Sequence, residues 1–225
     1  PDGSIIDASD TEPPAIWDAI EPDNRSLIAN LRSTYPPYNI NGTMIAGDLF
    51  LPSGVNDYVT PISRYDELCS FHDDERQSRW NRLAHSPDDN ADELLNLARE
   101  VVRDKYRHFE RLWQQDHYDF GLFWIGKTDS IQHHFWHDQD RVRSFYEFID
   151  EIIGRIRKNI DPDNLMILSD HGFGKVPDRR FHVNTWLQRE GYLSATGGRA
   201  GAAISGITQQ LLIKHVPKSA LRTAH

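Results

Sequence analysis

This 225-residue sequence has almost no cysteine, and it lacks long apolar runs and a basic charge balance. The single cysteine, Cys69, excludes an internal disulfide framework and a multi-cysteine zinc cluster. No uninterrupted apolar run approaches the roughly 18 residues that cross a bilayer, so we expect no membrane partner. The formal net charge of −9 argues against a nucleic-acid polymer as a partner, because neutralising phosphates requires a basic surface.

The hydrophobic residues that are present make up 38% of the chain, enough for a globular core. Two short apolar runs, FGLFWI at 120–125 and LMIL at 165–168, fit strands buried on both faces of a parallel sheet. Helical spacing of apolar residues before and between them predicts a βαβ alternation, and therefore an α/β fold. The other expected elements are a strand at 26–31, an apolar stretch at 44–51, and helices at 74–84, 91–115, 140–160, 184–193 and 207–215.

Carboxylate and imidazole side chains follow each of the two buried runs. Asp129 and His133 are four residues apart and share a face of any helix that begins there. Asp170 and His171 are adjacent, and His182 follows eleven residues after His171. Because ligands bind at the carboxyl ends of parallel strands, and these donor types suit divalent metals, the sequence predicts a site for one or two such ions.

Each of these residues also has a purely structural interpretation. Asp129 is a good helix N-cap, and Asp170 suits the cap of a turn. An isolated histidine such as His182 is often a hydrogen-bonded structural residue. His134 and His137 fit the polar surface of a helix better than a ligand role.

Three motifs resemble the type I phosphodiesterase/nucleotide pyrophosphatase group of the alkaline phosphatase superfamily: TDSIQHHFW (128–136), LMILSDHGFG (165–174) and FHVNTWLQREGYL (181–193). The segments PAIWDAI (14–20) and TYPPYNINGTMIAGDLFLPS (34–53) are similar to the connection that follows the nucleophile region in that family.

The resemblance implies an α/β, alkaline-phosphatase-like sandwich with a mostly parallel sheet, incomplete in this chain. Residues 1–225 would then form part of one catalytic domain. Within it, we expect 55–117 to be a helical insertion and 194–225 to be a partial C-terminal segment.

The same resemblance implies two divalent metal ions, usually zinc and sometimes manganese. Asp129 and His133 correspond to ligands of one ion, and Asp170 and His171 to ligands of the other; His182 would complete the first site. The implied activity is hydrolysis of phosphodiester or pyrophosphate bonds through a covalent phospho-enzyme. The substrate would be a small-molecule phosphoester or a nucleotide.

The chain departs from the family pattern in one respect, since family members also carry an aspartate and a Thr or Ser nucleophile upstream of the segment matched here. Nothing in residues 1–14 supplies them, so we expect a piece of a longer enzyme that is inactive alone. A phosphomutase or sulfatase-like relative and a non-catalytic metal-binding domain stay open as alternatives. We expect a cytoplasmic location and make no prediction of oligomeric state.

Overall fold

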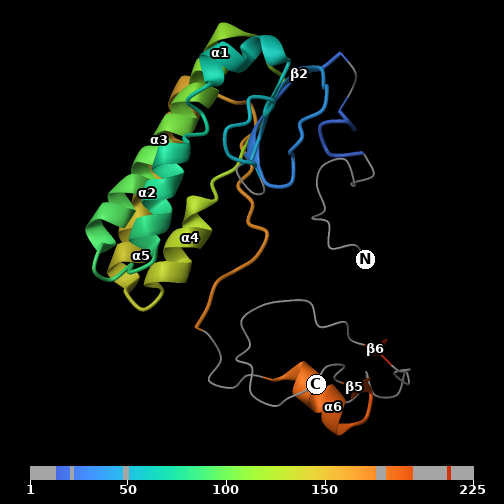
Figure 1. Ribbon diagram of the computed structural model, residues 1–225. Helices are drawn as coiled ribbons and strands as arrows, with labels where there is room; N and C mark the ends of the chain where they lie inside the picture. Colours follow the sequence, from blue (N-terminus) through green and yellow to red (C-terminus); the bar gives the residue numbers. More distant parts are fainter. Residues whose placement is uncertain (1–13, 21–22, 48–50, 176–180, 195–211, 214–225) are drawn as a thin grey trace. The chain divides into compact units, whose positions relative to one another are not determined.

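The computed structural model describes residues 14–20, 23–47, 51–175, 181–194 and 212–213 (Figure 1). The chain divides into two units, Pro1–Gly174 and Lys175–His225, which are described separately below. No helix within the described ranges is both long enough and apolar enough to span a bilayer.

A sheet of four strands organises the first unit. The strands are β1 (Ser26–Leu31), β2 (Gly42–Ala46), β3 (Val59–Thr60) and β4 (Phe120–Phe123), and their order across the sheet is β3-β2-β1-β4. β1 runs parallel to both β2 and β4, whereas β3 pairs antiparallel with β2. This is the mixed α/β fold with a mostly parallel sheet that the sequence predicts.

The central strand β1 is covered on both faces. Leu27, Ile28 and Ala29 have no exposed surface, although alternate side chains of a strand point to opposite sides. Such an unbroken apolar run is typical of a central parallel strand, because β1 pairs on both edges and is packed on both faces.

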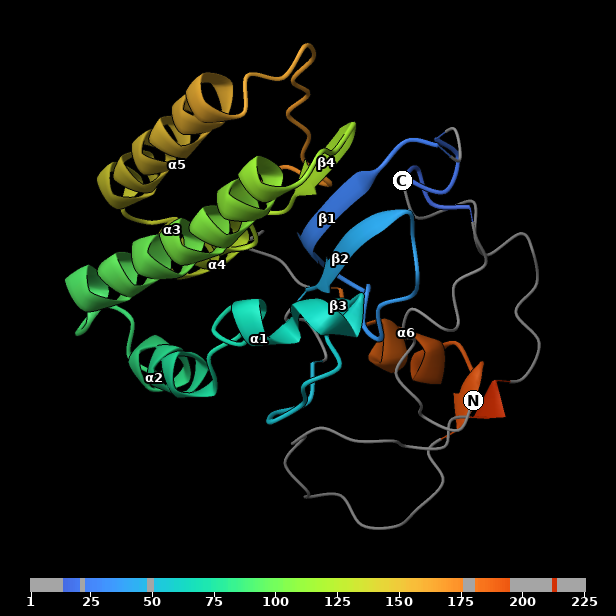
Figure 2. The ribbon, with the colours of Figure 1, turned by 90° about the horizontal axis from the view of Figure 1, so that it is seen from above.

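Helix α3 (Ala91–Gln115) is the main support of the sheet, and α4 (Lys127–Phe135) and α5 (Gln139–Asn159) pack on it (Figure 2). Its length of 25 residues allows it to belong to two cores. Toward the sheet, Phe109 and Leu112 pack with Leu27 of β1. Toward the other helices, Leu94 and Tyr106 join a cluster with residues of α4 and α5.

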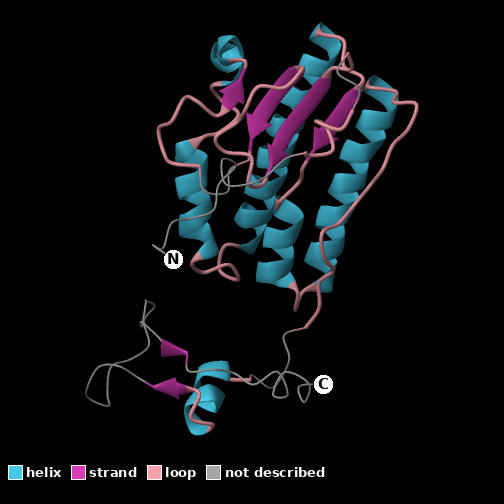
Figure 3. Cartoon of the chain, turned by 90° about the vertical axis from the view of Figure 1, so that its right-hand side faces the viewer, coloured by secondary structure: helices cyan, strands magenta, loops and turns pink. Residues whose placement is uncertain are grey.

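The remaining helices of this unit are short and lie on the same side as α3 (Figure 3). They comprise a 3-10 turn at Ile62–Arg64, α1 (Tyr65–Leu68) and α2 (Asp74–Ala84). The predicted boundaries at 74–84 and 91–115 are confirmed, and α5 begins one residue before the predicted start.

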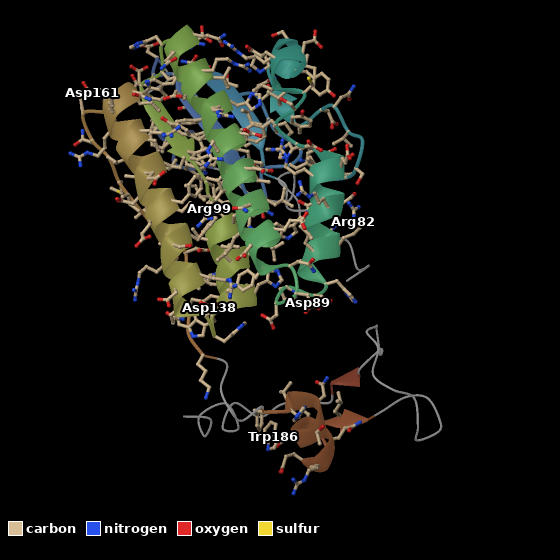
Figure 4. The ribbon with its side chains drawn as sticks, turned by 90° about the vertical axis from the view of Figure 1, so that its left-hand side faces the viewer. Arg82, Asp89, Arg99, Asp138, Asp161 and Trp186 are labelled. Carbon is tan, nitrogen blue, oxygen red and sulfur yellow. The ribbon has the colours of Figure 1, made fainter. Side chains whose placement is uncertain are left out.

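Side-chain hydrogen bonds cap the start of α5 and link α3 to α5. Asp138, labelled in Figure 4, caps α5 by accepting from the backbone N–H of Arg141. Arg99 of α3, also labelled there, donates to Ser144 Oγ of α5 at 2.8 Å. These polar contacts orient two helices whose packing surfaces are otherwise apolar.

Two predicted strands differ from the structure. The run at 120–125 forms a strand only over Phe120–Phe123, and it is half-buried rather than fully buried because β4 is the edge of the sheet. The run at 165–168 forms no strand, and the exposed fractions of its four side chains range from 43% to 81%. Apolar composition does not make a strand without a neighbour to complete the hydrogen-bond ladder, and 165–168 joins no strand among the described residues.

The second unit contains α6 (Val183–Arg189) and a short antiparallel pair, β5 (Leu193–Ser194) with β6 (Leu212–Ile213). The predicted helix at 184–193 is confirmed in its first part. It ends before Gly191, whose φ of +76° suits a residue that closes a helix. The predicted helix at 207–215 is wrong at 212–213, which are a strand, and its other residues lie outside the described ranges.

The α3–α5 core gives a direct test of this packing. Phe145 has no exposed surface, whereas its neighbour Tyr146 is 45% exposed. We expect Phe145→Ala to lower the free energy of unfolding by about 3–5 kcal/mol, because it leaves a cavity between helices. Tyr146→Ala should cost less than about 1 kcal/mol. Chemical denaturation of both variants checks this, and equal losses would contradict the assigned core.

Candidate functional site

The carboxyl ends of β1 and β4 lie at the same edge of the sheet, because the two strands are parallel and Ala29 pairs with Phe123. Arg32 follows β1 directly, and a connection of three residues joins the end of β4 to the start of α4 at Lys127. Gly126 allows this tight connection, since a Cβ there would stand 2.2 Å from the ring of Trp124. The candidate site is built at this edge.

A buried polar bridge holds the two strand ends together. Asn30, at the end of β1, adopts the left-handed backbone region with φ of +65°, which asparagine tolerates better than most residues. Its amide donates to the carbonyl of Trp124 at 2.9 Å. Its side-chain oxygen accepts from Lys105 Nζ of α3 at 2.6 Å, and both Asn30 and Lys105 are buried.

Asp129 and His133 lie on one face of α4, as their spacing predicts. Asp129 Oδ1 is 3.3 Å from His133 Nε2. The other carboxylate oxygen, Oδ2, is 3.7 Å from the guanidinium of Arg32. The carboxylate is thus placed between an imidazole and a cation, each from a different element.

Asp170 and His171 reach the same place from the segment that follows 165–168. His171 Nε2 lies 4.0 Å from Asp129 Oδ1 and 3.8 Å from Asp170 Oδ2. His171 Nδ1 is 2.9 Å from the carbonyl of Gly172, so Nδ1 carries the proton and donates it. This hydrogen bond, and then the charge of Asp170, raise the pKa of His171. In the neutral ring, Nε2 is therefore the free acceptor that faces Asp129.

One carboxylate oxygen in this group lacks a hydrogen-bond donor. Asp129 Oδ1 is buried and makes no hydrogen bond, although two imidazoles stand near it. A buried acceptor without a partner costs about 1–3 kcal/mol, and a charged one costs more. The same oxygen belongs to a carboxylate, which binds cations, and its position near the two imidazoles suits it to bind one.

The side chains of this group match a metal ion in their chemical type. Carboxylate and imidazole are the donors that zinc and manganese take. Among the described residues, no group of three or more His, Cys, Asp or Glu side chains is arranged as it stands to hold an ion. The structure thus brings Asp129, His133 and His171 together, and their role as ligands stays a prediction.

The two other predicted ligands differ in placement. Asp170 belongs to the group through His171, with its side chain 71% exposed. His182 lies in the second unit, at the residue before α6, where its side chain makes no capping hydrogen bond. Its assignment to the metal site stays a prediction.

Aromatic rings flank the histidines. Phe173 meets the ring of His133 edge-on, with centroids 4.9 Å apart, and lies 5.1 Å from Trp136. His134 packs against Trp80 on another side of α4, and burial lowers its pKa. His134 is thus half-buried rather than a fully solvated surface residue.

Sequence reasoning missed the cations beside this site. Arg32, Lys105 and Lys127 line a cavity of about 50 Å³ that also touches Asn30 and Ser130. Two signals were available in the sequence. Arg32 directly follows the predicted strand at 26–31, and Lys105 falls within the apolar stripe of the helix at 91–115, where a charged residue is unusual.

Comparison with family models assigns the chain to a known family. The family model for type I phosphodiesterase/nucleotide pyrophosphatase matches residues 8–224. No curated protein and no solved structure matched the chain. The mixed α/β architecture with its mostly parallel sheet is consistent with an alkaline-phosphatase-like fold. Because the match spans nearly the whole chain, this protein belongs to the type I phosphodiesterase/nucleotide pyrophosphatase family, a family of phosphodiesterase- and pyrophosphatase-type hydrolases.

Proposed function

We propose that this chain supplies the metal-ligand part of a hydrolase site for phosphodiester or pyrophosphate bonds. Family membership supports the class of reaction. The observation that carries the proposal is the buried Asp129 Oδ1, which lacks a hydrogen bond and faces the Nε2 atoms of His133 and His171. A divalent ion satisfies such an oxygen and is ligated by both types of side chain.

The five predicted ligands divide between two ions. Asp129 and His133 would hold one, completed by His182, and Asp170 with His171 would hold the other. Zinc is the first candidate and manganese the second. Bound ions would supply Lewis-acid polarisation of a phosphoryl oxygen.

Arg32, Phe173 and His171 have separate roles in the proposed site. Arg32 lies beside Asp129, stacks 4.6 Å from the Trp124 ring, and has a buried Nε without a hydrogen-bond acceptor. It can donate to an oxygen of a phosphoryl group, the kind of contact for which guanidinium geometry is suited. Phe173 shields His133 from water on one side. The Gly172 carbonyl keeps the His171 ring oriented with Nε2 inward.

Hydroxyl groups near the site are already engaged with the backbone of α4. Thr128 Oγ1 donates to the carbonyl of Ile125 at 3.0 Å, and Ser130 Oγ lies 3.5 Å from the carbonyl of Gly126. These contacts, together with the family resemblance, support our proposal that the nucleophilic Thr or Ser comes from a segment outside these 225 residues. Its oxygen would attack phosphorus and the bond to the leaving group would break, and water would later cleave the bond between enzyme and phosphorus to release a phosphomonoester.

Metal binding tests the central residue. We expect the metal-free chain to bind Zn²⁺ or Mn²⁺ in isothermal titration calorimetry. Asp129→Asn should weaken that binding at least about tenfold, because it removes the charge from the buried oxygen while keeping the shape.

Asp140→Asn is the matched control, since Asp140 is 94% exposed on α5 and away from the group. It should leave the affinity within about twofold of the parent chain. Equal metal affinity in Asp129→Asn and the parent would reject the site.

Hydrolysis tests the reaction. The 225-residue chain should hydrolyse bis-p-nitrophenyl phosphate no faster than buffer, because the nucleophile is absent. A longer form that includes the upstream segment should do so, and EDTA should abolish the activity until Zn²⁺ or Mn²⁺ is restored.

The same assay separates the alternatives. Rapid turnover by the 225-residue chain would refute the external nucleophile. Faster cleavage of p-nitrophenyl sulfate than of the phosphodiester would favour a sulfatase-like relative. Metal binding without any hydrolysis by the longer form would favour a non-catalytic metal-binding domain.

A further inference from the structure

A cleft beside α2 and α3 gathers three arginine side chains. Its volume is about 340 Å³, at the lower end of the range for small-molecule pockets. It shares no lining residue with the cavity at Arg32. The residues that line this arginine cleft are Ser70, Arg76, Asp104, Arg107, His108 and Arg111.

The spacing along α3 explains how the cleft is formed. On α3, Asp104, Arg107 and Arg111 are three or four residues apart, and His108 stands next to Arg107. These four side chains therefore form a stripe along one face of the helix. Arg76 faces this stripe from α2, with its Nη1 2.9 Å from Asp104 Oδ2. All six lining residues are polar or charged, so the cleft offers several hydrogen-bonding groups to a ligand.

Asp104 is the only carboxylate among the lining residues, and two arginines share it. Arg76 contacts one of its oxygens and Arg107 contacts the other, at 3.0 Å. A second carboxylate, that of Asp73, reaches Arg76 from outside the lining at 3.6 Å. Each guanidinium carries several N–H donors, so these carboxylates leave donors unused on the cleft side.

Arg111 adds to this excess of donors. It donates to the backbone carbonyl of Glu67 and to His108 Nδ1, but its buried Nε has no hydrogen-bond partner. A buried guanidinium N–H without an acceptor is costly, just as the buried Asp129 Oδ1 is costly without a donor. The guanidinium of Arg111 therefore has an N–H that no acceptor satisfies among the residues that the structure describes.

His108 adds a hydrogen-bonding group to the cleft. Because Arg111 can only donate, His108 Nδ1 is the acceptor and Nε2 carries the proton toward Ser70 Oγ, 3.1 Å away. Burial, and then the charge of Arg111, lower the pKa of His108, against the opposing effect of Asp104 and Glu67. The ring is thus neutral at pH 7 and adds a hydrogen-bonding edge, not a further charge.

We propose that the arginine cleft binds a small phosphate-type oxyanion, either inorganic phosphate or the phosphate group of a phosphomonoester. A phosphate anion offers mainly acceptor oxygens, and the three guanidinium groups of the cleft have only one carboxylate acceptor among the lining residues. Paired N–H donors of arginine match adjacent phosphate oxygens in bidentate contacts. The proposal is independent of the hydrolase function, since no lining residue belongs to the group around Asp129.

Calorimetric titration of the full 225-residue chain with sodium phosphate tests this, in EDTA and at constant ionic strength set with chloride. We expect a 1:1 complex. Arg111→Gln should weaken phosphate binding at least about tenfold, the loss expected for a charge-assisted hydrogen bond. Arg107→Gln, at a 63% exposed side chain that can be replaced without disturbing the core, should weaken it several-fold.

Three controls make the result specific. Arg143→Gln removes a 70% exposed arginine of α5 outside the cleft and should change the affinity less than about twofold. Asp129→Asn should also leave it unchanged, which separates this site from the metal site. Asp104→Asn should tighten binding, because it removes the one carboxylate that repels the anion from within the lining.

Titration with AMP identifies the source of the anion. Binding of AMP that Arg111→Gln weakens points to a phosphomonoester, whereas binding of phosphate alone points to the free anion. The proposal is overturned if about 10 mM phosphate gives neither heat nor a shift in melting temperature. It is also overturned if Arg143→Gln loses as much affinity as Arg111→Gln, or if a folded Asp104→Asn variant binds more weakly.

Discussion

Parallel pairing of β1 with β4, with Ser26 opposite Phe120 and Ala29 opposite Phe123, places two strand ends side by side. The bridge from Lys105 through Asn30 to the Trp124 carbonyl joins those ends to α3. Because α4 starts immediately beyond β4, its first turn is then held next to Arg32. The position of Asp129 follows from this pairing, and His133 follows from Asp129 through the turn of the helix.

Burying Lys105 would be unfavourable if its ammonium group met only apolar side chains. Its contact with the Asn30 oxygen, at 2.6 Å, satisfies one donor, and the left-handed backbone of Asn30 aims that oxygen at α3. The cost of strained backbone and of a buried charge is commonly concentrated at functional sites. Here Asn30, two residues before Arg32, has the left-handed backbone and also contacts the buried Lys105, which supports the assignment of the functional site to this edge.

The charge of the chain is distributed unevenly. Its net charge of −9 favours neither phosphates nor other anions at long range. At short range, however, Arg32 and Lys127 stand at one cavity and three arginines stand at another. The proposed recognition of small phosphates is therefore local, and the overall charge would oppose binding of a nucleic-acid polymer.

Much of the fold and part of the candidate site could be predicted from the sequence. Helical spacing located α2, α3 and α5 because amphipathic periodicity is a local property. The proximity of Asp129 to His133 is also local, since one turn of helix brings them together. The motifs were sufficient to predict the family.

Sequence alone therefore determined α2, α3 and α5, the central strand β1, the Asp129–His133 pair and the family. Tertiary structure decided that 165–168 forms no strand and that His171 approaches Asp129. It also decided that Arg32 flanks the site and that Arg76 completes a cleft with Arg107 and Arg111. The physical reason is that strand pairing and contacts between elements depend on which distant segments meet, and no local pattern of side chains encodes that distance.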